Sequence, residues 1–376
     1  MEAKGTEPTK SKDIFAVLAA LDNNNAEEAA EAATKSREGD DSYSLVVGPK
    51  GSGKTSLINY FLNPNKADEP KPTAALDYVY ARRAVPGSNR KAVAHIWELA
   101  ATKRVKELVR VPLAPERVAQ SVVIIVLDLS APGDVLPWLV KWISLLRGVL
   151  TDILTAASKA PVEALAIEKL KDEAMTRYGP THPDKREVTP LPIPTVILCS
   201  KFDTFRDEDG VKRKGIIQAL RYVAHTYGAT LQFTSLKDKA LATQLRTTIN
   251  SVVFHTDGKT TKEVDPVKAI YVPAGADSFE DIGLPKGSRP QDFDEGSPEK
   301  RLKTWLKIAA ELYPPSPSLP DIAVDALEEE KDEAEEKFPA PAIDAMRRQK
   351  RDELRRYKEK KVQAEKKATS KKEAKE

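Results

Sequence analysis

Residues 44–61, SLVVGPKGSGKTSLINYF, decide the fold. An apolar strand pattern leads into a glycine-rich loop, and the loop leads into a helix that opens with Lys54 and Thr55. Residues 48–55 fit G-x-x-x-x-G-K-[ST] in the strand–loop–helix context that this pattern requires. The stretch predicts a phosphate-binding P-loop, and the alternative is a glycine-rich turn without a ligand.

The chemistry expected of this loop follows from its residue types. Glycines let backbone N–H groups turn toward phosphate oxygens, and the helix N-terminus adds the positive end of its dipole. Lys54 is expected to reach the β- and γ-phosphates, and the Thr55 hydroxyl is expected to bind Mg²⁺. The predicted phosphate-binding residues are Gly48, Gly51, Gly53, Lys54, Thr55 and Ser56.

Strand and helix patterns alternate along the chain from residue 43. The strand candidates are 43–48, 77–84, 93–99, 121–130, 194–200, 229–235 and 268–275. The helix candidates are 53–62, 134–157, 160–178, 209–227 and 237–253. Near-continuous apolar strands are typical of parallel strands buried on both faces. We therefore expect an α/β fold, a Ras-like doubly wound and mostly parallel sheet with added helices.

The bulk composition narrows the class of protein. Charged residues make up 31% of the chain, but the formal net charge is only +3, which argues against a nucleic-acid partner. The lone Cys199 allows no disulfide within the chain and fits a reducing compartment. No apolar run approaches the roughly 18 residues of a membrane span, and no signal peptide is visible. We expect a soluble intracellular protein.

The pattern divides the chain into four parts. Residues 1–40 form a polar segment with a possible short helix, and residues 41–275 form the P-loop domain with a helical insertion at 134–190. Residues 276–340 read as a Pro-rich linker with short helices, one of them over 297–313. Residues 341–376 form a strongly basic helix or tail, either a solvated arm or a contact for an acidic tubulin tail, anionic lipid or coiled-coil partner.

A later strand carries a candidate site for a guanine base. Ser200-Lys201-Phe202-Asp203 resembles N-K-x-D, with Ser in place of Asn. Asp203 is positioned to accept from the guanine N1–H and N2–H₂ groups, and Lys201 to pack over the base. Ser235-Leu236-Lys237, after the next strand, stands where S-A-K would hold the base through its backbone. The predicted base-binding residues are Lys201, Asp203 and Ser235.

The catalytic elements of a GTPase are incomplete. Thr73 lies at a suitable spacing for the switch threonine that caps Mg²⁺. The D-x-x-G that senses the γ-phosphate is replaced by Glu98-Leu99-Ala100-Ala101, and no Gln follows to orient water. We expect hydrolysis to be slow or absent, with no catalytic residue, and nucleotide binding to remain possible as GDP or GTP with Mg²⁺.

Several ordered stretches carry a family resemblance. PKPTAALDYVYARRA, AVAHIWELA, VIIVLDLSAPGDVLPW, VILCSKFDTF, ALRYVAHTYGATLQFTS and AGADSFEDIG resemble the light intermediate chains of cytoplasmic dynein 2, the ciliary retrograde intraflagellar-transport dynein. The resemblance covers residues 43–285 and returns within the basic tail. The family tends to have glycines after the W-E-L motif, where this chain has Ala100 and Ala101.

The resemblance implies a Ras-like domain that serves as a non-catalytic accessory subunit. The implied partners are the cytoplasmic dynein 2 heavy chain, whose tail it would bind and stabilise, other dynein 2 subunits, intraflagellar-transport particles and, indirectly, microtubules. The implied location is the cytoplasm and the cilium or flagellum, at the axoneme and basal body. The short basic tail does not imply the adaptor binding of the dynein 1 relatives.

The helix pattern at 134–150 is unusually apolar. Trp138 and Trp142 are four residues apart and share a helix face. Either this face packs on the sheet, or it is an aromatic anchor for the heavy-chain tail.

Three functions remain open from the sequence. The favoured one is a dynein scaffold subunit, and the second is an active GTPase switch that regulates ciliary traffic. The third is a P-loop ATPase or kinase with Asp128 as its strand-end carboxylate.

Overall fold

The structure is a computed structural model that describes residues 41–65, 69–85, 89, 91–100, 105–158, 161–256, 258–285 and 298–316. All of these residues belong to one compact unit. The predicted N-terminal segment 1–40 and the predicted basic tail 341–376 lie outside the described residues.

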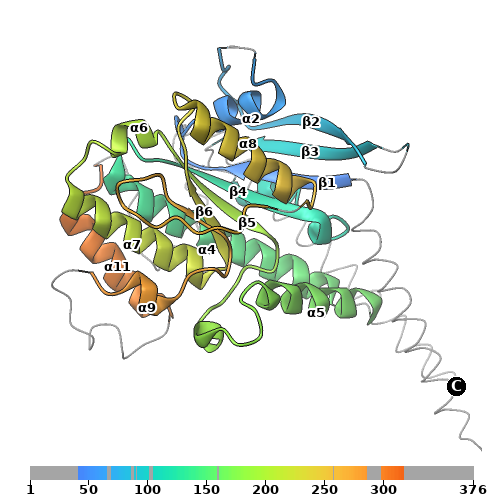
Figure 1. Ribbon diagram of the computed structural model, residues 1–376. Helices are drawn as coiled ribbons and strands as arrows, with labels where there is room; N and C mark the ends of the chain where they lie inside the picture. Colours follow the sequence, from blue (N-terminus) through green and yellow to red (C-terminus); the bar gives the residue numbers. More distant parts are fainter. Residues whose placement is uncertain are drawn as a thin grey trace, which may run out of the picture. The chain divides into compact units, whose positions relative to one another are not determined.

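A seven-stranded sheet forms the centre of this unit, in the order β2-β3-β1-β4-β5-β6-β7 (Figure 1). Neighbouring strands from β3 to β6 are parallel, whereas β2 and β7 pair antiparallel at the two edges. The strands are β1 (Asp41–Val47), β2 (Leu76–Ala84), β3 (Lys91–Leu99), β4 (Ser121–Asp128), β5 (Thr195–Ser200), β6 (Ala229–Phe233) and β7 (Tyr271–Val272). This arrangement confirms the predicted α/β fold class.

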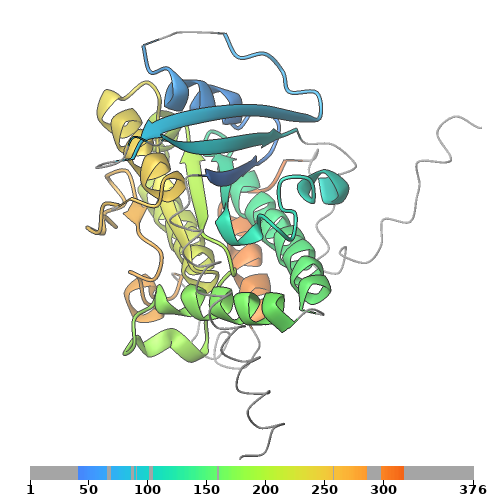
Figure 2. The ribbon, with the colours of Figure 1, turned by 90° about the vertical axis from the view of Figure 1, so that its right-hand side faces the viewer.

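Helices cover both faces of the sheet (Figure 2). On one face, α2 and α8 pack over an apolar cluster that includes Val46, Leu57 and Ile124. On the other face, α4, α7 and α11 contact one another over the larger cluster. The main helices are α2 (Lys54–Leu62), α4 (Pro132–Ala157), α5 (Pro161–Thr176), α7 (Gly210–Thr226), α8 (Lys239–Val253) and α11 (Pro298–Leu312). The shorter ones are α3 (Val105–Val109), η1 (Val118–Gln120), η2 (Pro183–Arg186), α6 (Phe202–Phe205) and α9 (Phe279–Ile282).

Sequence patterns explain why these elements form. Every residue of β5 is buried, as is all of β4 except Asp128, and this matches the continuous apolar runs of a two-sided core. Asp209 and Asp238 cap α7 and α8, since each carboxylate accepts from two backbone N–H groups of the first turn. The expected last strand is shorter than its apolar pattern, because only Tyr271 and Val272 pair with β6.

Helix α4 settles one of the two alternatives for its tryptophans. Trp142 is 3% exposed and belongs to the larger core cluster, so its ring presents no surface to a partner. This corrects the anchor interpretation for Trp142. Trp138 is partly buried, with the Lys141 ammonium 5.2 Å from its ring centroid, and its anchor role stays a prediction. None of the helices in the described residues has the length and apolar content that crossing a bilayer requires.

Candidate functional site

The P-loop joins the end of β1 to the start of α2, near the middle of the sheet. Gly48, Gly51 and Gly53 have φ angles of +149°, +80° and +89°, which L side chains rarely adopt. A Cβ on Gly48 would lie 2.1 Å from the carbonyl oxygen of Val126, so only glycine lets the loop pass this close to the backbone of β4. At Gly51 and Gly53 a Cβ would meet open space, so glycine serves the backbone conformation there.

The Lys54 ammonium is folded into the loop itself. Its Nζ donates to the carbonyl oxygens of Gly48 at 3.1 Å and Pro49 at 2.9 Å, and the residue is buried. Burial lowers the pKa of Lys54, and the nearby Glu98 carboxylate opposes that shift. To reach a phosphate, the ammonium must exchange these carbonyls for phosphate oxygens.

Thr55 and Glu98 meet across the ends of two adjacent strands. The Thr55 hydroxyl donates to Glu98 Oε1 at 2.8 Å, and Glu98 is buried at the end of β3, beside β1. The predicted magnesium ligand, Thr55, is therefore bonded to Glu98, the residue that replaces the Asp of D-x-x-G. The structure places a carboxylate beside Thr55 and Lys54, where a nucleotide's metal would bind. Ser56 lies partly buried in the first turn of α2.

Thr73 is not engaged in this cluster. It lies in the segment leading into β2, and its hydroxyl oxygen is buried without a hydrogen-bond partner among the described residues. The segment is fixed where it enters β2, because the Ala100 N–H donates to the Ala75 carbonyl. A magnesium-capping role for Thr73 stays a prediction.

Ser200 connects the P-loop to the base end of the site. Its hydroxyl lies 2.8 Å from the carbonyl oxygen of Ser52 and 2.9 Å from that of Leu127. A short hydroxyl in place of the usual Asn amide thus holds the loop against β4 and β5. The sequence pattern shows only that Ser replaces Asn here and gives no sign of this contact across 148 residues.

The predicted base-binding residues come together after β5 and β6. Asp203 accepts from the Ser235 hydroxyl at 2.6 Å and from the Lys237 ammonium at 2.6 Å. Both hydrogen bonds lower the pKa of Asp203, the one from Lys237 more than the one from Ser235, and so keep its carboxyl group ionised. Lys237 is 81% exposed, so its contact with Asp203 is open to solvent.

Lys201 and Asp128 form the remaining pair at this end. Lys201 has a left-handed backbone, with φ of 58°, and its ammonium forms an ion pair with Asp128. The second Asp128 oxygen accepts from the backbone and hydroxyl of Ser130. Asp128 thus closes a turn, and Glu98 is the carboxylate that bonds Thr55, which weighs against Asp128 as the carboxylate of an ATPase.

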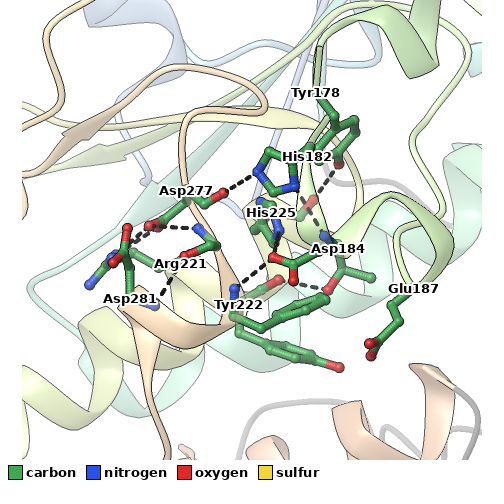
Figure 3. A network of polar contacts seen from close by, with 12 residues as sticks. Tyr178, His182, Asp184, Glu187, Arg221, Tyr222, His225, Asp277 and Asp281 are labelled. Atoms are coloured by element: carbon green, nitrogen blue, oxygen red, sulfur yellow. Dashed lines mark hydrogen bonds and ion pairs between the residues drawn. The ribbon is translucent and has the colours of Figure 1, made fainter. Parts of the chain in front are cut away.

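A second polar cluster lies beside α7 and was not found from the sequence (Figure 3). We call it the buried network and define it by Tyr178, His182, Asp184, Arg221, His225 and Asp277. Arg221 binds Asp277 through two hydrogen bonds of 2.8 and 2.7 Å, and the two side chains are 7% and 2% exposed. Lys262 adds a 3.3 Å contact to the same carboxylate.

The histidines of the buried network have defined roles. His225 Nε2 donates to Asp184 Oδ2 at 2.9 Å, and the same oxygen accepts from the Phe279 N–H at 2.8 Å. His182 Nδ1 accepts from the Asp184 N–H, so its Nε2 carries the proton and donates to the Asp277 carbonyl at 2.8 Å. Tyr178 donates to the His225 carbonyl.

These contacts decide between a ligand site and a structural one. Donor atoms of His182, Asp184 and His225 lie within 4.8 Å of one another, a spacing that a metal ion can bridge. Each already has a partner, and the hydrogen bonds account for the arrangement without an ion. The network fastens the segment after β7 to α7. His182 and Asp184 are two residues apart, but the bond from Asp184 to His225 spans 41 residues and that from Arg221 to Asp277 spans 56, so no sequence motif marks it.

Comparison with known proteins supplies the remaining information. Residues 26–166 match the family described as dynein light intermediate chain (DLIC). The chain is 33% identical over 315 residues to human cytoplasmic dynein 2 light intermediate chain 1, which covers 84% of this chain and 86% of that protein. The zebrafish protein of the same name is 32% identical, with 84% of each chain covered.

More distant relatives agree. Human cytoplasmic dynein 1 light intermediate chain 1 is 24% identical over 272 residues, covering 64% of this chain and 51% of that protein. The crystal structure of the dynein light intermediate chain's conserved domain aligns with a TM-score of 0.51 at 20% identity, covering 75% of this chain and 93% of that one. This structural likeness supports the fold alone.

Proposed function

The chain belongs to the family of cytoplasmic dynein 2 light intermediate chains, which are dynein accessory subunits, and on that premise we propose that it binds and stabilises the tail of the dynein 2 heavy chain. We further propose that it serves retrograde intraflagellar transport along ciliary microtubules. Other dynein 2 subunits and intraflagellar-transport particles are then its further partners. Its places of work are the cytoplasm and the axoneme and basal body of a cilium or flagellum.

The extent of the similarity carries this proposal. Identity of 33% spans 84% of the chain and 86% of the human dynein 2 protein, whereas identity to the human dynein 1 protein is 24% over 64% of the chain. A similarity of this length includes the P-loop domain, its inserted helices and the strands after them. Similarity over this length favours a shared role as a dynein subunit over a resemblance confined to the P-loop.

A non-catalytic role is supported by the residues around Thr55. In P-loop NTPases the P-loop hydroxyl and a strand-end Asp hold the metal together, and here the carboxylate 2.8 Å from the Thr55 hydroxyl belongs to Glu98, with Ala100 and Ala101 after it in place of the γ-phosphate-sensing Gly. The side chain of Glu98 is one methylene longer than the Asp of D-x-x-G. It brings negative charge to the place where the nucleotide's own charges would develop. We therefore expect hydrolysis to be slow or absent.

A guanine nucleotide is proposed as a structural ligand, as GDP or GTP with Mg²⁺. A Cβ at Gly51 or Gly53 would meet open space, and the Asp203 carboxylate, which accepts from the Ser235 hydroxyl at 2.6 Å, would accept from the guanine N1–H and N2–H₂ groups. The phosphates of a bound nucleotide would accept hydrogen bonds from backbone N–H groups of the loop and so stiffen it. Lys54 and Thr55 would hold its phosphates and metal.

The first test is recovery of the dynein heavy chain from ciliated cells. Tagged wild-type chain and Lys54→Ala are expressed at equal levels, and the co-purified heavy chain is quantified by mass spectrometry against a tag-only control. We expect equal recovery by both, since the Lys54 ammonium donates to two carbonyls of its own loop, those of Gly48 and Pro49. Recovery by wild type alone would assign the nucleotide a role in shaping the binding surface. If neither variant recovered heavy chain above the control, the scaffold proposal would fail.

The second test addresses the GTPase switch directly. Phosphate release by the purified wild-type chain is measured with GTP and Mg²⁺, and nucleotide carried through purification is identified by chromatography. We expect no turnover above that of the Lys54→Ala variant. Turnover at the rate of ordinary small GTPases, lost in that variant, would move the switch ahead of the scaffold.

A further inference from the structure

Strand β2 is a long, regular edge strand. It lies at one end of the sheet and pairs with β3 in unbroken register from Leu76 opposite Leu99 to Ala84 opposite Lys91 (Figure 1). Its sequence, LDYVYARRA, contains no Pro, Gly or Lys, and the regular register leaves no bulge. Natural edge strands use Pro, charged side chains such as Lys, and bulges, among other features, to discourage pairing with another chain, and of these features β2 has only charged side chains, those of Asp77, Arg82 and Arg83. A regular nine-residue edge without Pro, Lys or a bulge indicates a strand that accepts a partner.

The outer side of β2 is accessible in the described part of the chain. Tyr78 and Tyr80 are 41% and 51% exposed, and Asp77, Arg82 and Arg83 are also exposed. No described residue outside β3 forms a backbone hydrogen bond with β2. Two exposed tyrosines on one strand are a common feature of interaction surfaces.

One hydrogen bond fixes which backbone groups point outward. The Tyr78 N–H donates to the neighbouring Asp77 Oδ1 at 2.9 Å, so it faces away from β3. Because N–H and C=O groups alternate sides along a strand, those of Tyr80 and Arg82 also point outward. An added strand would therefore form its ladder hydrogen bonds with Tyr78, Tyr80 and Arg82.

The charge pattern of β2 identifies the strand that fits. When β2 is set antiparallel to itself about Tyr80, Asp77 stands opposite Arg83 of the second copy, and Tyr78 stands opposite Arg82. Tyr80 then faces Tyr80 of the second copy. Both charged pairs are attractive, since Asp77 meets Arg83 twice and each Arg82 meets a tyrosine ring. We propose that two copies of this chain pair through β2 about a two-fold axis, joining their sheets into one.

Existing contacts leave these side chains free to rearrange. Arg83 is held by a 3.4 Å contact to the Thr256 hydroxyl and lies 5.8 Å from the Phe254 ring centroid. Arg82 already lies over the Tyr80 ring of its own strand, 4.9 Å from the ring centroid. Asp77 must release the Tyr78 N–H, which then donates to the carbonyl of Arg82 in the second copy. The interface is small, so we expect a weak dimer whose population rises with concentration.

Charge reversal tests the proposed pairing. Asp77→Arg puts Arg opposite Arg at both ends of the strand pair, and Arg83→Asp puts Asp opposite Asp. Each variant alone should be monomeric by sedimentation velocity at concentrations where the wild type approaches twice the chain mass of 41.4 kDa. An equimolar mixture of the two should form a dimer again, because every facing pair is then Asp with Arg. Recovery on mixing is specific to this antiparallel register.

Two controls complete the experiment. Asp207→Arg reverses an exposed charge on the connection between α6 and α7 and should leave the dimer unchanged. Tyr80→Pro removes an outward N–H without touching the ladder to β3 and should also give a monomer. Circular dichroism checks that each variant keeps its fold. A monomeric wild type at the highest concentration reached, or single charge variants that dimerise as the wild type does, would overturn the proposal.

Discussion

The P-loop site and the buried network are both polar clusters that join distant segments, and they differ in what holds their charges. At the base end of the P-loop site, which comprises the loop at 48–55 and the predicted base-binding residues, Asp203 is bonded to Lys237, which is 81% exposed and can return to water at little cost. In the buried network, Arg221 and Asp277 are 7% and 2% exposed, and a lost partner leaves a charge without solvent. The difference separates a site that can exchange its internal contacts for a ligand from one that must keep them.

The largest expected effect comes from breaking the buried pair. Asp277→Asn removes the charge that neutralises Arg221, and the free energy of unfolding should fall by about 3 kcal/mol. Urea unfolding followed by far-ultraviolet circular dichroism measures it. The matched control is Asp281→Asn, which is 59% exposed and also binds Lys262, and it should cost less than about 1 kcal/mol. Equal losses in the two variants would contradict the assignment of the network as structural.

Within the P-loop, the largest loss of stability is expected from substitution of Gly48. Gly48→Ala should lower the free energy of unfolding by about 2–3 kcal/mol, because the new Cβ meets the Val126 carbonyl at 2.1 Å and the backbone φ is unfavourable. Gly51→Ala, with open space around it, should cost about 1 kcal/mol from backbone strain alone. The same unfolding measurement compares them. A larger loss at residue 51 than at residue 48 would show that the loop packs differently.

Protonation of His225 should destabilise the buried network less than loss of the Arg221–Asp277 pair does. Burial lowers the pKa of His225 below its usual value, although Asp184 and Asp277 raise it, and His182 adds to the lowering. The unfolded chain therefore takes up a proton before the folded chain does as pH falls below about 6.5. Stability should fall as pH drops from 7 toward 5, and His225→Gln should flatten that dependence. A thermal unfolding series that keeps its slope in this variant would assign the dependence to other groups.

The smallest stability effect is expected at Lys54. Its Nζ bonds two carbonyls of its own loop, so Lys54→Ala should change the free energy of unfolding by less than about 1 kcal/mol. The same variant should abolish any rise in unfolding temperature caused by GDP or GTP with Mg²⁺. This combination marks a ligand site. A large loss of stability without nucleotide would place Lys54 with the structural residues instead.

The sequence alone determined the α/β fold, the strand–loop–helix of the P-loop pattern, and the placement of Asp203 and Ser235 after neighbouring strands. These follow from local signals: apolar runs set buried strands, glycines set the loop, and polar residues at the ends of parallel strands meet at one edge of the sheet. The strand and helix boundaries agree with the patterns to within a few residues, apart from the short β7.

Only the tertiary structure decided the contacts that give each polar group its character. The bond from Thr55 to Glu98 spans 43 residues, that from Ser200 to Ser52 spans 148, and that from Arg221 to Asp277 spans 56. It likewise decided that Trp142 is buried while Tyr80 is exposed, although both belong to apolar patterns. Periodicity reports which face of an element is apolar, whereas the partner of a charge depends on which elements the completed fold brings side by side.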